Sequence, residues 1–256
     1  KQKVTDIVER YLEVEQFLSI ESCFSNPLAD LEIKDKQDVE KAVNKLLKAW
    51  RIGFNALPNV IELLEDKEIK VVEIEAPEEF DGFSGWADGK YPIIVINKSY
   101  GVERKRLTAL HELAHLLLTF PDDIEHKEME KRCFQFGAAM LMPEETFRME
   151  LGNHRSHIPA AELILIRETY GISIQAIMQR AKDLGIINDF TFLNFRKKIS
   201  KNRKEEGLGQ YLGKEESSRF RQLVFRAAAE EVISMSKAAN LFNQKLAAFR
   251  KEFIAL

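Results

Sequence analysis

Two histidines and a glutamate interrupt the apolar run LTALHELAHLLLTF, residues 107–120. Residues four positions apart lie on one face of an α-helix, so His111 and His115 can point at a single ion. Glu112 lies about 100° around the helix, beside that ion rather than on it. This H-E-x-x-H arrangement predicts a zinc site, because imidazole nitrogen is a good zinc ligand and the neighbouring carboxylate can take a proton from a metal-bound water.

The surroundings of the motif distinguish it from a chance pattern, which would occur in roughly one per cent of chains of this length. Apolar residues enclose the motif nearly all the way round the helix: Leu107, Leu110, Leu113, Ala114, Leu116, Leu117 and Leu118. Burying a carboxylate and two imidazoles there without partners is costly. A bound metal ion would supply the missing partner.

A catalytic zinc needs a third protein ligand, and a following helix can supply it. The candidates are Asp122, Asp123, Glu125, His126, Glu128 and Glu130. Helical spacing puts Glu130 on an apolar stripe with Cys133, Phe134, Gly137, Ala138 and Leu141. Glu128 shares its face with Lys131 and Arg132, which indicates a surface salt bridge. We therefore expect Glu130 to be the third ligand.

The elements around these helices indicate an α+β fold. Helices are expected near 3–20, at 38–53 and after Pro58. EIKVVEIEAP and YPIIVINKS are strand candidates separated by EEFDGFSGWADGK, so two or three strands precede the H-E-x-x-H helix. The rest reads as helical, at 127–141, after Pro143, and at 159–170, 173–184, 215–232 and 236–253. YPIIVIN is the candidate for an exposed edge strand that pairs with a substrate chain.

Composition sets the broad class. The chain has 256 residues, 45% of them apolar, and a net charge of −3, so it can bury a real core and has no overall attraction for nucleic acid. No signal peptide or membrane-spanning stretch is evident, and the two cysteines form no disulfide framework. We expect a cytoplasmic protein in which Cys23 and Cys133 are small core residues.

The stretches RLTALHELAHLLL and EKRCFQFGAAMLMP resemble the ImmA/IrrE metallo-endopeptidase family, the zinc peptidase domain of helix-turn-helix transcriptional regulators. The resemblance covers roughly 26–245 and includes FDGFSGW, PIIVIN and LIRETYGISIQAIMQRAKDLGII. It implies a zincin-like core, in which a small sheet accompanies the H-E-x-x-H helix, and a repressor or other regulatory protein as substrate. The opening RYLEVEQFL looks like the tether after a helix-turn-helix domain, which would lie upstream of Lys1.

The sequence departs from the family pattern beside the third ligand. The family usually has Asn or Asp four residues after the liganding glutamate, where this chain has Phe134. A polar residue there could hold a liganding histidine by its second ring nitrogen, so Phe134 leaves that partner unassigned and puts the strength of the site in doubt. Cys133 replaces the usual alanine and is an alternative ligand.

We expect three parts: an N-terminal helix and linker at 1–35, a zincin-like peptidase domain at 36–150, and a helical region at 151–256 that contains a helix-turn-helix-like unit. The expected activity is zinc-dependent cleavage of a regulatory protein, with zinc held by His111, His115 and Glu130 and with Glu112 activating the bound water. The alternatives are a non-proteolytic, zinc-stabilised regulator or binding module, and a DNA-binding repressor whose peptidase fold is a relic. Homo-oligomers and DNA contacts through an upstream domain stay open.

Other features carry no assignment. The oxyanion-stabilising residue is left open among His126, His154, His157, Tyr100 and Tyr170. The helix-turn-helix-like stretch AELILIRETYGISIQAIMQRAKDLGII is expected to pack against the peptidase domain or recognise a partner, because its second helix has few cations. The basic run FRKKISKNRK, 195–204, is expected to be a solvated loop between domains.

Overall fold

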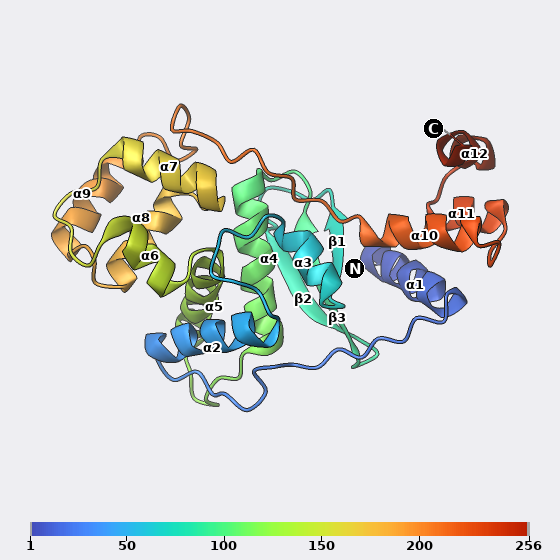
Figure 1. The fold of residues 1–256 in the computed structure, drawn as a ribbon, viewed down its shortest axis with the longest axis horizontal. Coiled ribbons are helices and arrows are strands. Elements are labelled where there is room, and N and C mark those ends of the chain that lie inside the picture. Colours follow the sequence, from blue (N-terminus) through green and yellow to red (C-terminus); the bar gives the residue numbers. More distant parts are fainter. Residues whose placement is uncertain (1, 255–256) are drawn as a thin grey trace.

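The computed structural model describes residues 2–254, which form twelve helices and one three-stranded sheet (Figure 1). The expected α+β class is confirmed. The elements are α1 (Gln2–Phe17), α2 (Lys36–Ala49), α3 (Val60–Asp66), β1 (Lys70–Ile74), β2 (Gly82–Ala87), β3 (Tyr91–Asn97), α4 (Val102–Leu117), α5 (His126–Leu141), α6 (Glu144–Leu151), α7 (Ala160–Tyr170), α8 (Ile174–Asp183), α9 (Asp189–Ile199), α10 (Arg219–Ala229), α11 (Met235–Leu241) and α12 (Leu246–Ile254).

The sheet has the order β1-β3-β2, with β1 parallel and β2 antiparallel to β3. The expectation that YPIIVIN forms an exposed edge is wrong, because this segment is the central strand β3 and pairs on both sides. The edge beside the metal-binding motif belongs to β2, GFSGWA, which lies in the stretch read as a separator. Its two glycines and half-exposed pattern hide it from a search for apolar alternation.

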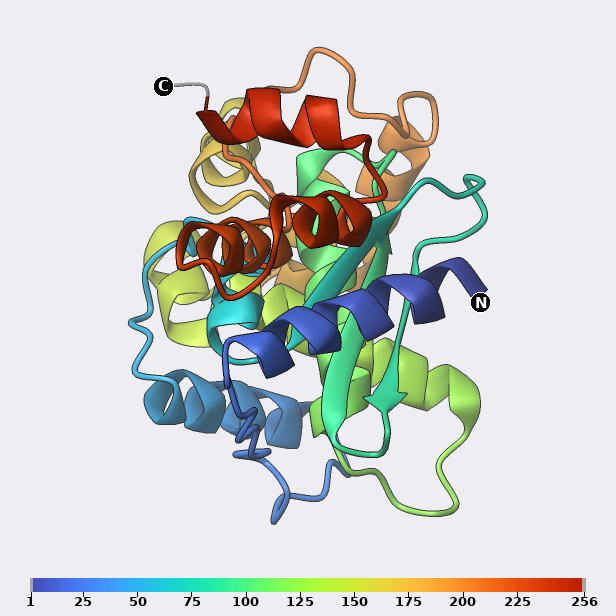
Figure 2. The same ribbon diagram turned by 90° about the vertical axis from the view of Figure 1, so that its right-hand side faces the viewer.

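The two faces of β3 contribute to different cores. Ile94 and Ile96 belong to the main core together with residues of α3, α4 and α5. Ile93 and Val95 point the other way, into a smaller cluster that includes Val8 of α1. Helix α4 therefore covers one face of the sheet, whereas α1 crosses the other, as Figure 2 shows. The H-E-x-x-H helix is thus fixed between the sheet and the remaining helices.

The C-terminal third differs in detail from the expected helices. The helix expected at 236–253 is two helices, α11 and α12, and the helix expected from 215 begins only at Arg219. Helix α9 was not anticipated, and it includes residues 195–199 of the basic run expected to be a loop. Helices α10 to α12 share a second apolar cluster with Tyr11 and Val14 of α1, so the two ends of the chain pack together.

An extended segment, residues 200–218, joins α9 to α10 and is called the strap below (Figure 1). Two buried glutamates attach it to the body. Glu205 accepts hydrogen bonds from the backbone NH groups of Ile174 (3.0 Å) and Gln175 (2.8 Å) at the start of α8. Glu215 accepts from the NH groups of Val60 and Ile61, at the start of α3. These carboxylates occupy helix N-termini, where anions are stabilised.

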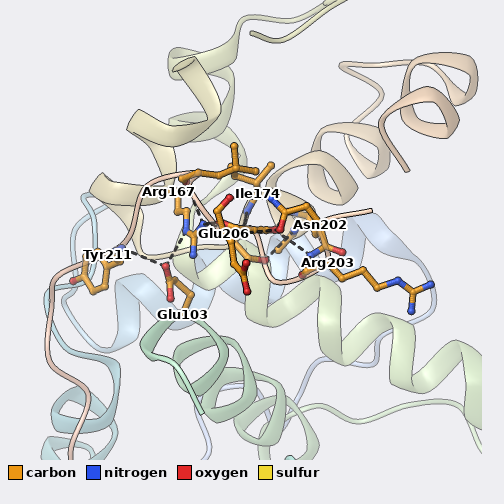
Figure 3. Close-up of polar contacts among 12 residues, drawn as sticks. Glu103, Arg167, Ile174, Asn202, Arg203, Glu206 and Tyr211 are labelled. Atoms are coloured by element: carbon orange, nitrogen blue, oxygen red, sulfur yellow. Dashed lines mark hydrogen bonds and ion pairs between the residues drawn. The ribbon is translucent and has the colours of Figure 1, made fainter. Parts of the chain in front are cut away.

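The strap is also tied to α4. Glu103, in the first turn of α4, accepts hydrogen bonds from Arg167 Nε (2.9 Å) and from the backbone NH of Tyr211 (3.2 Å), as Figure 3 shows. Arg106, which is fully buried, is ion-paired with Glu215. The helix that carries the metal-binding motif therefore has a fixed ionic connection to the strap.

Candidate metal centre

Helix α4 delivers His111, Glu112 and His115 from its buried central turns. The side chains of His111 and Glu112 are almost fully buried, whereas that of His115 is 23% exposed. Because α4 packs on β2, β3 and α5, the three side chains are held at one end of a cleft rather than on an open surface. The expected apolar enclosure of the motif is present, since Leu110, Leu113 and Leu117 are all buried.

Helix α5 brings Glu130 to the same place, and a glycine permits the close approach. A Cβ atom added at Gly137 would lie 3.3 Å from both the His111 backbone nitrogen and the Leu107 carbonyl oxygen. Glycine removes that crowding, so α5 can lie tightly along α4. Helix α5 buries four members of the expected stripe, Cys133, Gly137, Ala138 and Leu141. The expectation is wrong for Phe134, which is 52% exposed and lies against the ring of His111.

The donor atoms of His111, His115 and Glu130 converge. The two Nε2 atoms are 3.1 Å apart, and each lies 3.3 Å from one oxygen of the Glu130 carboxylate. Ligands of a tetrahedral zinc at about 2.0–2.1 Å are separated by about 3.3 Å from one another. The spacing and the donor set, two imidazoles and a carboxylate, therefore fit a divalent transition metal.

The other residues considered as third ligand lie elsewhere. Asp122, Asp123 and Glu125 are exposed, and Glu128 pairs with Arg132 and Lys131 on the solvated side of α5. The thiol of Cys133 is 3.7 Å from Nδ1 of His115, the ring nitrogen that faces away from the donor cluster. Cys133 is thus placed to contact a ligand from behind. Cys23, expected in the core, is exposed.

Glu112 lies beside the cluster and is held by Ser84. The Ser84 hydroxyl on β2 donates a hydrogen bond of 2.9 Å to Glu112 Oε2. Burial raises the pKa of Glu112 to about 7, although the Ser84 hydrogen bond opposes this shift. A carboxyl group with this pKa can both accept and return a proton near neutral pH. Ser84 was not found from the sequence, because β2 itself was not recognised.

His111 has one nitrogen in the cluster and one without a partner. Burial, followed by the neighbouring His115, lowers its pKa to about 4, so the ring is neutral and its Nε2 lone pair is available. Its Nδ1 atom is buried and has no hydrogen-bond partner within residues 2–254. The ring of Phe134 lies against that of His111, with centroids 4.1 Å apart. The Asn or Asp usual in the family at this position could hold His111 by a hydrogen bond. Phe134 makes no polar contact with His111.

A cleft of about 660 Å³ opens over the cluster and is bounded by β2, α4 and α5. Of the residues considered for oxyanion stabilisation, His126 is the one near the donors: its Nε2 lies 3.7 Å from a Glu130 oxygen, and its side chain is 81% exposed. Tyr100 donates to the Glu78 carbonyl, and Tyr170 donates to Glu150. His154 and His157 lie on an exposed loop between α6 and α7.

The helix-turn-helix-like stretch, residues 161–187, contains α8 and nearly all of α7 and is packed into the body. Ile177 and Met178 of α8 are buried in the main core. Arg180 makes a two-pronged contact with Glu40 of α2 and donates to the Met142 carbonyl. The guanidinium group of Arg180 is therefore used in contacts within the protein.

Comparisons with known proteins found a family match and a solved structure with a partial alignment. Residues 64–182 match the model of a peptidase family described as the IrrE N-terminal-like domain, which confirms the resemblance seen in the paired helices. A solved structure, a Mycobacterium tuberculosis transcriptional regulator, aligns with 14% identity and a TM-score of 0.42 over 67% of this chain and 51% of that one. The chain thus spans about half of that regulator. No curated protein matches significantly.

The helices described between residues 2 and 254 include none long and apolar enough to cross a membrane.

Proposed function

Taking residues 64–182 as an IrrE N-terminal-like domain, we propose that the chain is a zinc-dependent endopeptidase that cleaves a regulatory protein such as a transcriptional repressor. The observation that carries the proposal is the spacing of the donors: two imidazole nitrogens and a carboxylate lie 3.1–3.3 Å apart beside a buried acid at the end of an open cleft. A structural zinc site usually has four protein ligands, whereas three ligands leave a position for chemistry. Residues 36–150 would supply the reacting groups.

The residues divide the work as follows. His111, His115 and Glu130 would hold the zinc, which when bound makes a water acidic and polarises a carbonyl group. Glu112 takes the proton from the attacking water and delivers it to the leaving amine. Ser84 keeps the carboxylate pointing into the cleft through its hydrogen bond.

The free edge of β2 is suited to hold the substrate. A substrate chain can extend a sheet by pairing with an exposed strand. Gly82 and Ser84 lie on the face of β2 that points to α4, since a Cβ atom at Gly82 would meet Thr108 and Glu112. A peptide paired with β2 would therefore pass directly over the proposed metal. This replaces β3, the strand expected from the sequence to have this role.

The test is a comparison of wild type with Glu112→Gln and with the control Glu128→Gln, which changes an exposed glutamate on α5. Each zinc-loaded protein is incubated with a cell extract, and newly formed peptide N-termini are identified by mass spectrometry. We expect defined new termini with wild type and Glu128→Gln, a loss of at least about 100-fold with Glu112→Gln, and equal zinc in all three. Equal zinc with no Glu112-dependent termini would contradict the endopeptidase.

That last outcome would favour the second candidate, a zinc-stabilised regulator that cuts nothing. The observation in its favour is the bare Nδ1 of His111 behind Phe134, because a metal-ligating histidine usually donates through its second nitrogen. The endopeptidase and the regulator would both bind zinc, but only the endopeptidase would cleave a peptide bond.

A further inference from the structure

The chain contains two three-helix units of the same design, α7-α8-α9 and α10-α11-α12. In each, the first helix ends before a residue with positive φ, Gly171 (60°) or Glu231 (56°). The second helix begins at a serine, Ser173 or Ser234, whose hydroxyl accepts a hydrogen bond from an NH group of the first turn. This is a helix-turn-helix arrangement with capped second helices.

The buried positions repeat as well. The residue before the serine is a buried isoleucine in both units, Ile172 and Ile233. Aligning the two serines also aligns further buried pairs: Leu163 with Val224, Ile166 with Ala227, Ile177 with Ala238, and Met178 with Ala239. The sequence did not reveal this repeat, because matching positions carry side chains of different size.

The two units have different surroundings. The first is buried in the main core, and Arg167 of α7 and Arg180 of α8 pair with carboxylates of other elements, whereas α9 exposes Arg196, Lys197 and Lys198. The second contributes to the cluster with α1 and lies at one end of the molecule, with α12 outermost (Figures 1 and 2). In Figure 1, α12 is seen along its axis while α10 and α11 are seen from the side, so α12 crosses the other two.

The outer surface of the second unit is polar and basic. Residues 219–254 contain seven Lys or Arg and three Glu, a net charge of +4, whereas the whole chain has −3. The α11–α12 connector and α12 expose these residues: Asn243, Gln244, Lys245, Ala247, Ala248, Arg250 and Lys251. Among the described residues, Lys245, Arg250 and Lys251 have no ion-pair partner. The exposed large apolar side chains of the unit are Val232 and Ile254.

We propose that residues 219–254 bind duplex DNA, with α12 in the major groove. The major groove admits an α-helix, and Ala247 and Ala248 in the first turn of α12 keep its surface low enough for close approach. Asn243 and Gln244 carry the amides that recognise base edges, and Lys245, Arg250 and Lys251 meet phosphates. Duplex RNA is disfavoured, because its major groove is too narrow for side chains to read. A protein partner would require a more apolar, aromatic centre than this face offers.

The proposal does not depend on the proposed peptidase activity, since the unit lies outside the cleft. It does give the activity a location: an endopeptidase held on DNA meets DNA-bound regulators at high effective concentration.

The test uses the full chain and a short fluorescein-labelled duplex of mixed sequence, followed by fluorescence anisotropy at several salt concentrations. The variant is Lys245→Glu/Arg250→Glu/Lys251→Glu. The control is Arg196→Glu/Lys197→Glu/Lys198→Glu, which reverses the same number of exposed cations on α9. We expect binding that weakens steeply with salt, a loss of roughly 100-fold in the α12 variant, and a change of under about threefold in the control.

A second measurement tests base recognition. Selection from a random duplex library should enrich a motif with wild type and with Glu112→Gln, and Asn243→Ala/Gln244→Ala should change the motif while circular dichroism shows an unchanged fold. The proposal is overturned by salt-independent or absent binding, by equal losses in the α12 and α9 variants, or by equal affinity for duplex RNA.

Discussion

Helix α4 carries two buried charged clusters that differ in how their charges are satisfied. In its first half, Arg106 pairs with Glu215 and donates to the carbonyl of Leu57 (2.7 Å), while Lys105 pairs with Glu73 (2.8 Å). In its second half, His111, Glu112, His115 and Glu130 gather without a cationic side chain. The two clusters are about one helical turn apart. Arg106 and Glu215 are fully buried, whereas the side chains of His115 and Glu130 are 23% and 32% exposed.

The difference separates a structural pair from a site arranged for an ion. Each buried cation of the first cluster has a carboxylate, so removing either partner leaves an unpaired charge. The second cluster places two imidazole nitrogens and a carboxylate at ligand distance, and beside them burial raises the pKa of the Glu112 carboxyl group. Two imidazoles and a carboxylate are a donor set that suits a divalent transition metal. Burial alone therefore does not identify a functional cluster; an excess of unpaired acceptors does.

The largest effect should come from breaking the first cluster. Arg106→Met leaves Glu215 buried and unpaired, so the free energy of unfolding should fall by about 3–5 kcal/mol. Arg106→Met/Glu215→Leu should recover much of this loss. The measurement is urea denaturation of the metal-free protein, with Arg104→Met as the control, because Arg104 pairs with Asp81 at the surface and should change stability by under about 1 kcal/mol. A double variant no better than the single would show that the charge pair is not the cause.

Breaking the second cluster should remove the metal and leave the fold. Glu130→Ala and His115→Ala should each weaken zinc binding by more than about 100-fold, because each removes one of three ligands. Zinc per chain is measured by elemental analysis after dialysis. Cys133→Ala is the matched control on α5 and should retain zinc. Retention of zinc in Glu130→Ala would move the third ligand to another residue.

The pH dependence of the metal-free protein should reveal two opposing groups. The pKa of Glu112 rises from 4.5 to about 7, so the folded state holds a proton that the unfolded state has lost, and stability falls as pH rises through this window. The pKa of His111 falls from 6.5 to about 4, so stability rises with pH between these values. The stability of wild type should therefore change little with pH, because the two effects oppose each other. Glu112→Gln removes one of them and should gain about 3 kcal/mol across the window. Parallel urea-midpoint curves for the two proteins would refute this assignment.

The smallest effect concerns Phe134. Phe134→Asn restores a side chain that can accept a hydrogen bond from Nδ1 of His111, and we expect zinc affinity to rise about tenfold. Competition with a chelator measures it. Phe134→Ala removes the ring without adding an acceptor, so equal affinities for the Asn and Ala variants would assign the effect to the ring.

The convergence of His111, His115 and Glu130 could be predicted from the sequence because it depends on local spacing. His111 and His115 are one helical turn apart, and the apolar stripe of α5 identifies Glu130. It did not predict what depends on distant contacts. The strand β2 is too rich in glycine to show alternation, so Ser84 and the free sheet edge were missed. Glu205 follows the basic run expected to be a solvated loop, and Glu215 was expected to begin a helix. Each is instead buried at the start of a helix from elsewhere in the chain.

The strap also determines which fragments of this protein can be stable. The family match ends at residue 182, but the counter-charge of Arg106 and the carboxylates at the starts of α3 and α8 come from residues 205 and 215. A fragment trimmed to the matched region would lack Glu215, so the guanidinium of Arg106, five residues before His111, would lose its ion-pair partner. Excising the matched region by sequence similarity would thus yield an unstable product, and cutting the strap would disturb the helix that carries His111 and His115.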